Sequence, residues 1–435
     1  MTGRPFLAYY GDDQTGSTDV MEALELRGVS TVLFTGIPTP DQQAKFADRQ
    51  AIGIAGTSRS ETPAWMDDNL PAVFEWLKEL GAEICHYKIC STFDSSPAVG
   101  SIGRAIDIGA AVFGQESTPL VVGAPELKRY TAFGNLFANF RGENFRVDRH
   151  PVMSTHPVTP MHEADLVRHL SLQTDKAVAL IDLVALKRGI SAADVDAVFD
   201  ASPVVVFDVL DEETQRATGA HLWRRREASP FVVGSSGVEY ALLRDGAGSP
   251  FAGRNRDFTP PGTKGPIAVV SGSCSPTTER QIRYAERHGF AGIALDAVKF
   301  ASGDADAEIA RAVKNGSKVL TGGESPLFYT ALGNETLEEL NTVEKQRIGT
   351  ALGRILGALI ADHKLGRVVV AGGDTSSHAI RQLGIFALEC LMPLPATPGS
   401  PLCRAHRSTD EAALDIAFKG GQVGNDDYFV LARDI

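Results

Sequence analysis

The sequence predicts an α/β protein of two domains, each a mainly parallel β-sheet with flanking helices. Its 435 residues exceed the roughly 250–300 at which a single hydrophobic core stops growing. Short uninterrupted apolar runs, typical of parallel strands covered on both faces, alternate with longer stretches of helical period. Glycine and proline dominate the stretch 246–266, which we interpret as a linker. We therefore expect domains at 1–245 and 267–435, with the active site in the cleft between them.

The first domain contains apolar runs that we expect to form parallel strands. Helical stretches lie between them, among them Thr18–Arg27, which Gly28 ends, and Pro71–Leu80, which Gly81 ends. The expected strands are Phe6–Tyr10, Thr31–Phe34, Ala51–Ala55, Ile84–Ile89, Leu120–Val122, Val178–Ile181, Val204–Phe207 and Phe231–Val233.

The second domain repeats the alternation and includes a long helix near Glu338–His363. Gly349, Gly353 and Gly357 recur every four residues in this helix, and each costs about 1 kcal/mol of helix propensity relative to alanine. We expect close packing against a neighbouring element to compensate. The expected strands are Ile267–Val270, Gly292–Leu295, Lys318–Leu320, Val368–Ala371 and Ile416–Phe418.

Charge and cysteine content argue against several kinds of partner and compartment. Lys and Arg number 42 against 54 Asp and Glu, a net charge of −12, which disfavours nucleic acid and anionic membranes. No run approaches the ~18 apolar residues of a membrane-spanning helix. Five cysteines without a C-x-x-C pair, and a start without an export signal, predict reduced thiols and a cytoplasmic location. The oligomeric state stays open, a homo-oligomer included.

Two loops of the first domain carry candidate chemistry directly after expected strands, where open parallel sheets bind ligands. Asp12 and Asp13 can accept a substrate hydroxyl proton or help to hold a cation, although an Asp helix cap explains them as well. Lys88 supplies a positive charge in the second loop. Hydroxyl groups suited to a polyhydroxylated anion accompany these residues, with simple turn capping as the alternative. They belong to Thr15, Ser91 and Thr92.

Three turns of the second domain favour phosphate binding. Each follows an expected strand, and two of them open a helix whose first N–H groups attract anions. Glycine also permits close approach of the backbone to a ligand, although ordinary β-turns use the same residues. The candidates are Ser271, Ser273 and Ser275 in the first turn, Gly372, Gly373, Asp374 and Thr375 in the second, and Gly420, Gly421 and Gly424 in the third.

Several common signatures are absent. The sequence has no G-x-x-x-x-G-K-[ST], no G-x-G-x-x-G after a strand, no G-x-S-x-G and no H-E-x-x-H. The ten histidines show no metal-ligand spacing, so direct metal ligands stay unknown. An acidic, lysine-assisted site in one half and phosphate-binding turns in the other are the arrangement of a kinase.

The ordered motifs resemble the four-carbon acid sugar kinase family, once catalogued as a domain of unknown function. The family's A-D-D-x-T-G-A is similar to residues 11–17, its G-R-x-T-x-x-G to 128–134, and its D-P-V-T-P-M to 156–161. In the second half, S-G-S-x-S, G-G-x-T-S and K-x-G-G-x-x-G are similar to the three turns above. The motifs span residues 11–424, and their shared order makes the match specific.

The resemblance implies a sugar-acid domain, an ATP domain, and transfer of the γ-phosphate to a terminal hydroxyl of a tetronate or 3-oxo-tetronate. On this basis Asp12 or Asp13 deprotonates the hydroxyl, while Lys88 and Arg129 hold the substrate carboxylate or the phosphoryl group. Mg²⁺ lies between the phosphates of ATP.

One departure from the family affects the predicted substrate. Where the family commonly has K-I-D-S-T-L-R-G, this chain has Cys90 in place of the acid and Asp94 in place of the base. Replacing Arg by Asp reverses a charge. A branched acid such as 3-oxo-isoapionate, which related kinases phosphorylate, is therefore a candidate.

Two other functions stay open at this stage. A sugar-acid lyase or aldolase would use Lys88 as a Schiff-base amine, with the phosphate-binding turns holding a substrate phosphate. A non-catalytic sensor would bind the acid without turnover. Borohydride trapping on Lys88 supports the lyase, whereas consumption of ATP supports the kinase.

Overall fold

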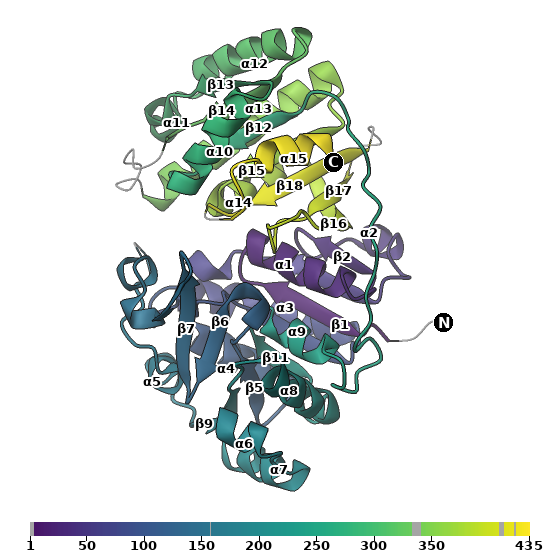
Figure 1. Ribbon diagram of the computed structural model, residues 1–435, viewed down its shortest axis with the longest axis vertical. Helices are drawn as coiled ribbons and strands as arrows, with labels where there is room; N and C mark the ends of the chain where they lie inside the picture. Colours follow the sequence, from purple (N-terminus) through teal and green to yellow (C-terminus); the bar gives the residue numbers. More distant parts are fainter. Residues whose placement is uncertain (1–3, 157, 333–340, 409–412, 422) are drawn as a thin grey trace. The chain divides into compact units, whose positions relative to one another are not determined.

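The computed structural model describes residues 4–156, 158–332, 341–408, 413–421 and 423–435, without the side chains of Thr342, Asp374, Thr375 and Ser377. The chain packs as two compact units (Figure 1). One comprises Met1–Val32 and Thr39–Arg256, and the other comprises Leu33–Pro38 and Asp257–Ile435. The short segment 33–38 belongs to the second unit, where Thr35 hydrogen bonds to the backbone of Ile385 and Phe386.

The first unit is built on a sheet of strand order β2-β3-β1-β4-β11-β5-β10-β9. The pairs from β3 to β9 are parallel, which confirms the predicted mainly parallel sheet. The strands are β1 (Leu7–Gly11), β2 (Thr31–Phe34), β3 (Ala51–Ala55), β4 (Ile84–Lys88), β5 (Thr118–Val121), β9 (Val178–Ile181), β10 (Val204–Phe207) and β11 (Phe231–Gly234).

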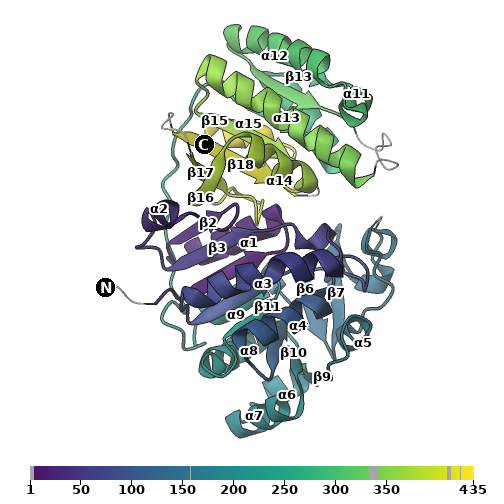
Figure 2. The same cartoon turned by 180° about the vertical axis from the view of Figure 1, so that it is seen from behind.

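Helices cover both faces of this sheet (Figures 1 and 2). Helices α3 (Pro63–Glu79) and α4 (Ile102–Phe113) lie on one face, while α1 (Gln14–Glu25), α8 (Glu212–Arg225) and α9 (Gly237–Leu243) lie on the other. The remaining helices are α2 (Pro40–Ala44), α5 (Leu166–Leu170), α6 (Leu183–Lys187) and α7 (Ala192–Ala201).

A separate antiparallel sheet of order β6-β7-β8 belongs to the same unit. Its strands are β6 (Arg129–Ala132), β7 (Asn135–Phe140) and β8 (Glu143–Arg146). Apolar and polar residues alternate in these strands, so the search for uninterrupted apolar runs missed them. Arg129, a predicted substrate-binding residue, is the first residue of β6.

The second unit has the strand order β13-β14-β12-β15-β18-β17-β16. The pairs from β13 to β18 are parallel, and β17 and β16 add an antiparallel edge. The strands are β12 (Ala268–Ser271), β13 (Phe290–Ala294), β14 (Ser325–Tyr329), β15 (Arg367–Ala371), β16 (Ile385–Met392), β17 (Leu402–Arg407) and β18 (Leu414–Lys419). The helices are α10 (Pro276–Glu286), α11 (Ala297–Ser302), α12 (Asp306–Thr321), α13 (Thr342–His363), α14 (Gly373–Gln382) and α15 (Tyr428–Asp434).

One expected strand is wrong, and one expected helix begins earlier than predicted. The run Lys318–Leu320 is the end of helix α12 and not a strand, because short apolar runs do not distinguish the two. The buried residues Ile309, Ala312 and Gly316 are spaced three and four positions apart, which is the period of a helix. Pro71 lies inside α3, which begins eight residues earlier at Pro63 behind a Thr62 cap.

The glycines of the long helix α13 pack closely, as expected. A Cβ atom on Gly349 would lie 2.7 Å from the His378 side chain, and one on Gly353 would lie 2.8 Å from the Ala379 backbone. Gly357 is looser, with Leu383 at 3.8 Å. All three neighbours belong to α14 or its end, so the glycines let the two helices approach. Glu338, where we placed the start of the helix, lies outside the described residues.

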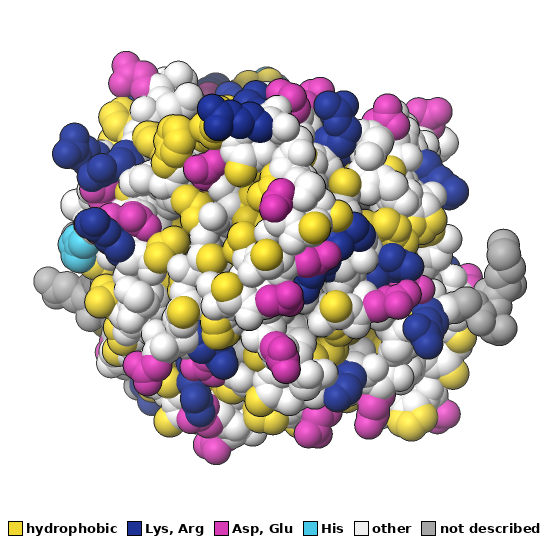
Figure 3. Space-filling model, turned by 90° about the horizontal axis from the view of Figure 1, so that it is seen from below, with side chains coloured by type: hydrophobic (Ala, Val, Ile, Leu, Met, Phe, Trp, Pro, Cys, Tyr) yellow, Lys and Arg dark blue, Asp and Glu magenta, His cyan; other side chains and the backbone are white. Residues whose placement is uncertain are grey.

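The surface and the described helices bear on the predicted partners. On the face drawn in Figure 3, basic and acidic side chains are interspersed, and no continuous basic track crosses that face. Among the described residues, no helix combines the length and the apolar character needed to cross a membrane.

Candidate functional site

The candidate acid-binding site lies at the carboxyl edge of the first unit's sheet. Strand β1 lies between β3 and β4, so the turns that follow these three parallel strands meet at one edge. The chain moves to opposite sides of β1 for β3 and β4, which makes this edge a topological switch point, where open α/β sheets bind ligands. Asp12 and Asp13 follow the central strand, and Lys88 ends β4.

Arg59, which the sequence analysis missed, clamps both predicted carboxylates. It lies in the 3₁₀ turn Ser58–Ser60 after β3. Its Nη2 lies 2.7 Å from Asp12 Oδ1 and 2.9 Å from Asp13 Oδ1, while Nη1 lies 2.9 Å from Asp13 Oδ2 and Nε 3.2 Å from Asp12 Oδ2. Its place in the turn between β3 and α3 was the signal that could have identified it.

The two carboxylates differ in environment. Asp12 is buried, with a side chain 7% exposed, whereas the side chain of Asp13 is 23% exposed. Burial raises the pKa of Asp12, the neighbouring Asp13 adds to the rise, and Arg59 opposes it without cancelling it. Asp13 also caps helix α1 by accepting a hydrogen bond from Gly16 N at 2.7 Å. The predicted cap and the predicted functional carboxylate are therefore the same residue.

Lys88 points into the same turn from the end of β4. It is 2% exposed, donates to Ile89 O at 3.0 Å, and lies 3.9 Å from Asp19 Oδ2. A Cβ atom on Gly16 would lie 3.0 Å from Lys88 Nζ, so glycine leaves room for the amine. Three buried polar atoms around this turn lack a hydrogen-bond partner in the described structure: Gln14 Nε2, Thr15 Oγ1 and Asp19 Oδ1. Buried polar atoms without partners are costly, and a polar ligand would satisfy them.

The residues that depart from the family motif form a hydrogen-bonded chain. Thr92 Oγ1 donates to Asp94 Oδ1 at 2.6 Å, and Cys90 Sγ lies 2.9 Å from Thr92 Oγ1. Burial alone would raise the pKa of Asp94, but the charge of Arg59 and the hydrogen bonds of Thr92 and Cys90 outweigh it and lower that pKa. Burial raises the pKa of the Cys90 thiol to about 11, so it is neutral. Ser91 lies in the same turn and is partly exposed.

Arg129 has no acidic partner among the described residues. Its Nη1 donates to the backbone oxygens of Leu127 at 3.1 Å and Lys128 at 3.2 Å, and its buried Nε has no partner. Burial lowers its pKa, and Cys90 lies within electrostatic range. An arginine in this state is suited to an incoming anion.

The candidate nucleotide site lies at the carboxyl edge of the second unit's sheet, where β12, β15 and β18 are adjacent. Gly272 N donates to Ala371 O at 3.0 Å, and Gly372 N donates to Lys419 O at 2.8 Å, so the three predicted turns meet. A Cβ atom on Gly421 would lie 3.2 Å from Ser273 Oγ.

The hydroxyls and helix starts of these turns suit phosphate groups. Ser275 caps α10, with Pro276 as its first residue, and α14 begins at Gly373. Ser271 Oγ accepts from Ser273 N at 3.4 Å, and Ser273 Oγ accepts from Ser275 N at 3.3 Å.

Four other predicted residues have particular positions. The side chains of Asp374 and Thr375 lie outside the described part of the structure. Gly424 has a φ of +89°, and a Cβ atom there would lie 2.9 Å from Thr397 and 3.1 Å from Tyr428. It is held among structural neighbours, unlike Gly421. Gly420 supplies a carbonyl oxygen that accepts from Lys419 Nζ at 2.8 Å.

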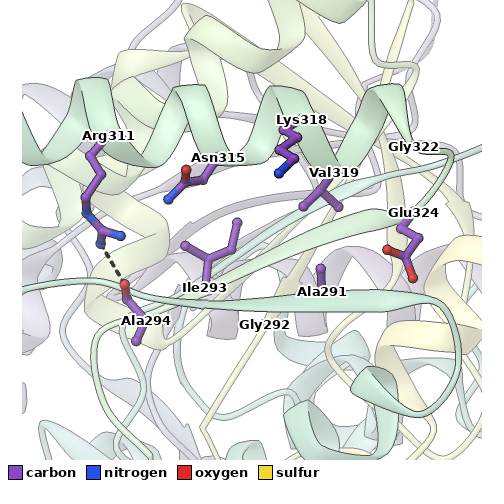
Figure 4. Close-up of a pocket in the computed structure, with 10 residues that line it drawn as sticks. All are labelled: Ala291, Gly292, Ile293, Ala294, Arg311, Asn315, Lys318, Val319, Gly322 and Glu324. Carbon is purple, nitrogen blue, oxygen red and sulfur yellow. Dashed lines mark hydrogen bonds between the residues drawn. The ribbon is translucent and has the colours of Figure 1, made fainter.

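Two further features bear on ligands. Within the described ranges, no three His, Cys, Asp or Glu side chains form a group able to hold a metal ion. A cavity of about 590 Å³ lies between β13 and α12, where Arg311 Nη2 donates to Ala294 O at 2.8 Å (Figure 4). Its lining includes Lys318 and Glu324 but no residue of the two candidate sites, so we assign it no part in the chemistry.

Comparisons with known proteins agree with an acid-binding first domain and a nucleotide-binding second domain. Residues 7–242 match the family described as sugar-binding N-terminal domain, and residues 268–429 match the nucleotide-binding C-terminal domain. A sugar-binding domain followed by a nucleotide-binding domain defines a carbohydrate kinase. The chain belongs to the four-carbon acid sugar kinase family, which confirms the resemblance seen in the motifs and favours the kinase over the lyase.

Individual relatives cover nearly the whole chain. The 3-oxo-isoapionate kinase of Paraburkholderia graminis is 44% identical, covering 98% of this chain and 94% of the relative. The 3-oxo-tetronate kinase of Burkholderia multivorans is 31% identical, covering 98% and 96%. A crystal structure of a Salmonella typhimurium protein, 26% identical, has a TM-score of 0.78 with 98% of each chain covered.

Proposed function

We propose that this acid-sugar kinase transfers the γ-phosphate of ATP to a terminal hydroxyl of a branched 3-oxo acid of the 3-oxo-isoapionate type. The observation that carries the proposal is the chain Cys90–Thr92–Asp94, which puts a neutral thiol and a carboxylate where the family commonly has an acid and a base. A change of charge in a loop of the candidate site suits a different acid from the linear tetronates. The 44% identity to a 3-oxo-isoapionate kinase supports the same choice. A linear 3-oxo-tetronate or tetronate is the second candidate.

Asp12 is the better candidate for the base that accepts the hydroxyl proton. Its pKa is raised by burial, and a base gains proton affinity as its pKa rises towards the working pH. Asp13 is occupied as the helix cap, whereas Arg59 contacts both carboxylates and does not distinguish them. Lys88 and Arg129 hold the acid's carboxylate or the phosphoryl group in transfer, and Thr15, Ser91 and Thr92 bind its hydroxyls.

The role of the second domain is to position the phosphates of ATP. Ser271, Ser273 and Ser275, the start of α14 at Gly372–Thr375, and Gly420 and Gly421 would hold the phosphates, and Mg²⁺ would neutralise part of their charge. Phosphoryl transfer needs little more than alignment of donor and acceptor and neutralisation of the phosphate charge. Both domains are needed, because one binds the acceptor and the other binds the donor. We place this reaction in the cytoplasm; all five cysteines lie in the described part of the chain, and no disulfide joins them.

The substrate is tested by a panel of linear and branched 3-oxo acids with Mg-ATP, scored by ADP release and by mass of the product. We expect the highest kcat/KM for the branched acid. The double exchange Cys90→Asp with Asp94→Arg restores the family pattern and should move the preference towards the linear acid, with thermal unfolding as the check on folding. Equal kcat/KM for both acids in the wild-type protein would contradict the proposal.

The base is tested by the matched variants Asp12→Asn and Asp13→Asn. Both remove one carboxylate from Arg59 and keep the side-chain volume, and Asn is still able to cap α1. We expect Asp12→Asn to lower kcat by about 10²–10⁴-fold, the usual contribution of a positioned base, and Asp13→Asn to lower it much less. The reverse order would assign the base to Asp13. A covalent borohydride adduct on Lys88 would instead support the lyase.

A further inference from the structure

Lys419 is buried within the candidate nucleotide site, yet neither the sequence analysis nor the proposed function assigns it a role. It ends β18, and its side chain is fully buried. Its Nζ donates to three neutral oxygens: Thr278 Oγ1 at 2.9 Å, Gly420 O at 2.8 Å and Gly421 O at 3.3 Å. No ion pair of Lys419 occurs within the described residues. Burying a charged lysine without an acidic partner lowers the stability of the fold, so a functional reason for its position is expected.

The three acceptors match the ammonium form. A charged lysine has three N–H donors and no acceptor, whereas a neutral amine has two donors. All three oxygens can therefore be satisfied only while Lys419 keeps its proton. Burial lowers the pKa of Lys419 to about 7, so the proton is held weakly until a negative charge comes near.

Thr278 links Lys419 by hydrogen bonds to the hydroxyl of Ser273, a predicted phosphate-binding residue. Its Oγ1 accepts from Lys419 and lies 3.1 Å from Ser273 Oγ, to which it donates its single hydrogen. Gly421 O, also at 3.1 Å, is the competing acceptor for that hydrogen. Ser273 Oγ further accepts from Ser275 N. With two donors directed at its oxygen, Ser273 keeps its own hydrogen for a ligand.

We propose that Lys419 is a positioning residue for the nucleotide: through Thr278 it orients the hydroxyl of Ser273 so that this hydroxyl donates to a phosphate oxygen. The donors run in one direction, from Lys419 Nζ to Thr278 Oγ1, from Thr278 Oγ1 to Ser273 Oγ, and from Ser273 to the ligand. Hydrogen bonds in such a chain polarise one another, so the charge of the lysine strengthens the last donor. The inference rests on the proposed phosphate-binding role of Ser273.

The test measures the affinity for Mg-ADP by calorimetry and the KM values for ATP and for the acid. We expect Lys419→Met to weaken Mg-ADP binding and raise the KM for ATP by about tenfold or more, the factor that one charge-assisted hydrogen bond is worth. The KM for the acid should not change. The variant should fold, because methionine fills the same space without a buried charge. Thr278→Val breaks the chain at its middle and should give the same result.

The decisive comparison is a double-mutant cycle with Ser273→Ala. If Lys419 acts through Ser273, adding Lys419→Met to Ser273→Ala should weaken Mg-ADP binding little further. Lys318→Met, at an exposed lysine of the same unit, is the control and should leave binding unchanged. Unchanged Mg-ADP affinity in Lys419→Met, or effects that multiply in the double variant, would overturn the inference while leaving the proposed function intact. Normal affinity in Ser273→Ala would overturn both the inference and the phosphate-binding role of Ser273.

Discussion

Replacing Arg59 tests how much this residue stabilises the folded protein through its contacts with the carboxylates of Asp12 and Asp13. Arg59→Met keeps much of the side-chain volume but deletes four hydrogen bonds to Asp12 and Asp13. Breaking a buried ion pair by removing one partner costs about 3–5 kcal/mol. Asp13 keeps access to water, so the loss falls mainly on Asp12, and we expect the lower end, about 3 kcal/mol. For a unit of this size that corresponds to a fall in Tm of about 6–12 °C.

The loss should depend on pH. The pKa of Asp12 is already raised in the folded wild-type protein, so the folded state binds more protons than the unfolded chain between the usual value of 3.8 and the raised value. The stability that this proton contributes is present at low pH and is lost as pH rises through that window. Without Arg59 the pKa of Asp12 rises further and the window widens. The destabilisation by Arg59→Met should therefore be small in acid and full at neutral pH.

Urea unfolding at about pH 5 and about pH 8 measures this difference, with the two units followed separately if they unfold separately. Arg104→Met is the matched control, because Arg104 pairs with Asp67 on the surface, where both side chains are more than 40% exposed. Surface pairs of this kind contribute about 0–1 kcal/mol. Equal stabilities of Arg59→Met and Arg104→Met at pH 8, or a loss that is the same at both pH values, would refute the reasoning.

Two further predictions concern the second unit. Because burial lowers the pKa of Lys419 to about 7 from 10.5, the unfolded chain binds more protons than the folded one between those values, and stability should rise with pH across that window. Urea midpoints should show this rise in the wild-type protein and lose it in Lys419→Met; a rise of equal slope in both proteins would contradict the cause. Arg367 is fully buried, and its guanidinium donates to the backbone oxygens of Ala432, Arg433, Ile435 and Gly262 and pairs with Asp415. Arg367→Met should therefore lower the free energy of unfolding by about 3 kcal/mol or more, and a loss below about 1 kcal/mol would show that these bonds contribute little.

The proximity of Asp12, Asp13 and Lys88 could be predicted from the sequence, whereas Arg59 could not be singled out. Strand ends in a parallel sheet meet at one edge, so a position directly at a strand end implies proximity. Arg59 also lies in a loop after a strand, but nothing in that loop distinguishes it from an ordinary surface arginine. It reaches both carboxylates because β3 lies beside β1 in the sheet.

Other features depended on contacts between segments distant in sequence. Lys419 could not be separated from an ordinary lysine beside a turn until Thr278, 141 positions earlier, was found bonded to it. The segment Leu33–Pro38 reads as the end of a strand of the first domain, yet it packs with the second unit. Local patterns contain no information on such pairings, because burial and hydrogen bonding between remote segments decide them.

The charges at the acid-binding site explain why the proposed substrate should be an anion. Three cations and several carboxylates lie there, but not every cation is paired with a carboxylate. Arg59 is occupied by Asp12 and Asp13, and Lys88 lies 3.9 Å from Asp19. Arg129 alone of these three cations has no acidic partner within the described residues, and its burial makes an unpaired charge costly. A substrate carboxylate placed there would relieve that cost, so we expect Arg129 to bind one end of the proposed acid. In the proposed reaction, the hydroxyl end of the acid would then face Asp12, the carboxylate whose pKa is raised by burial.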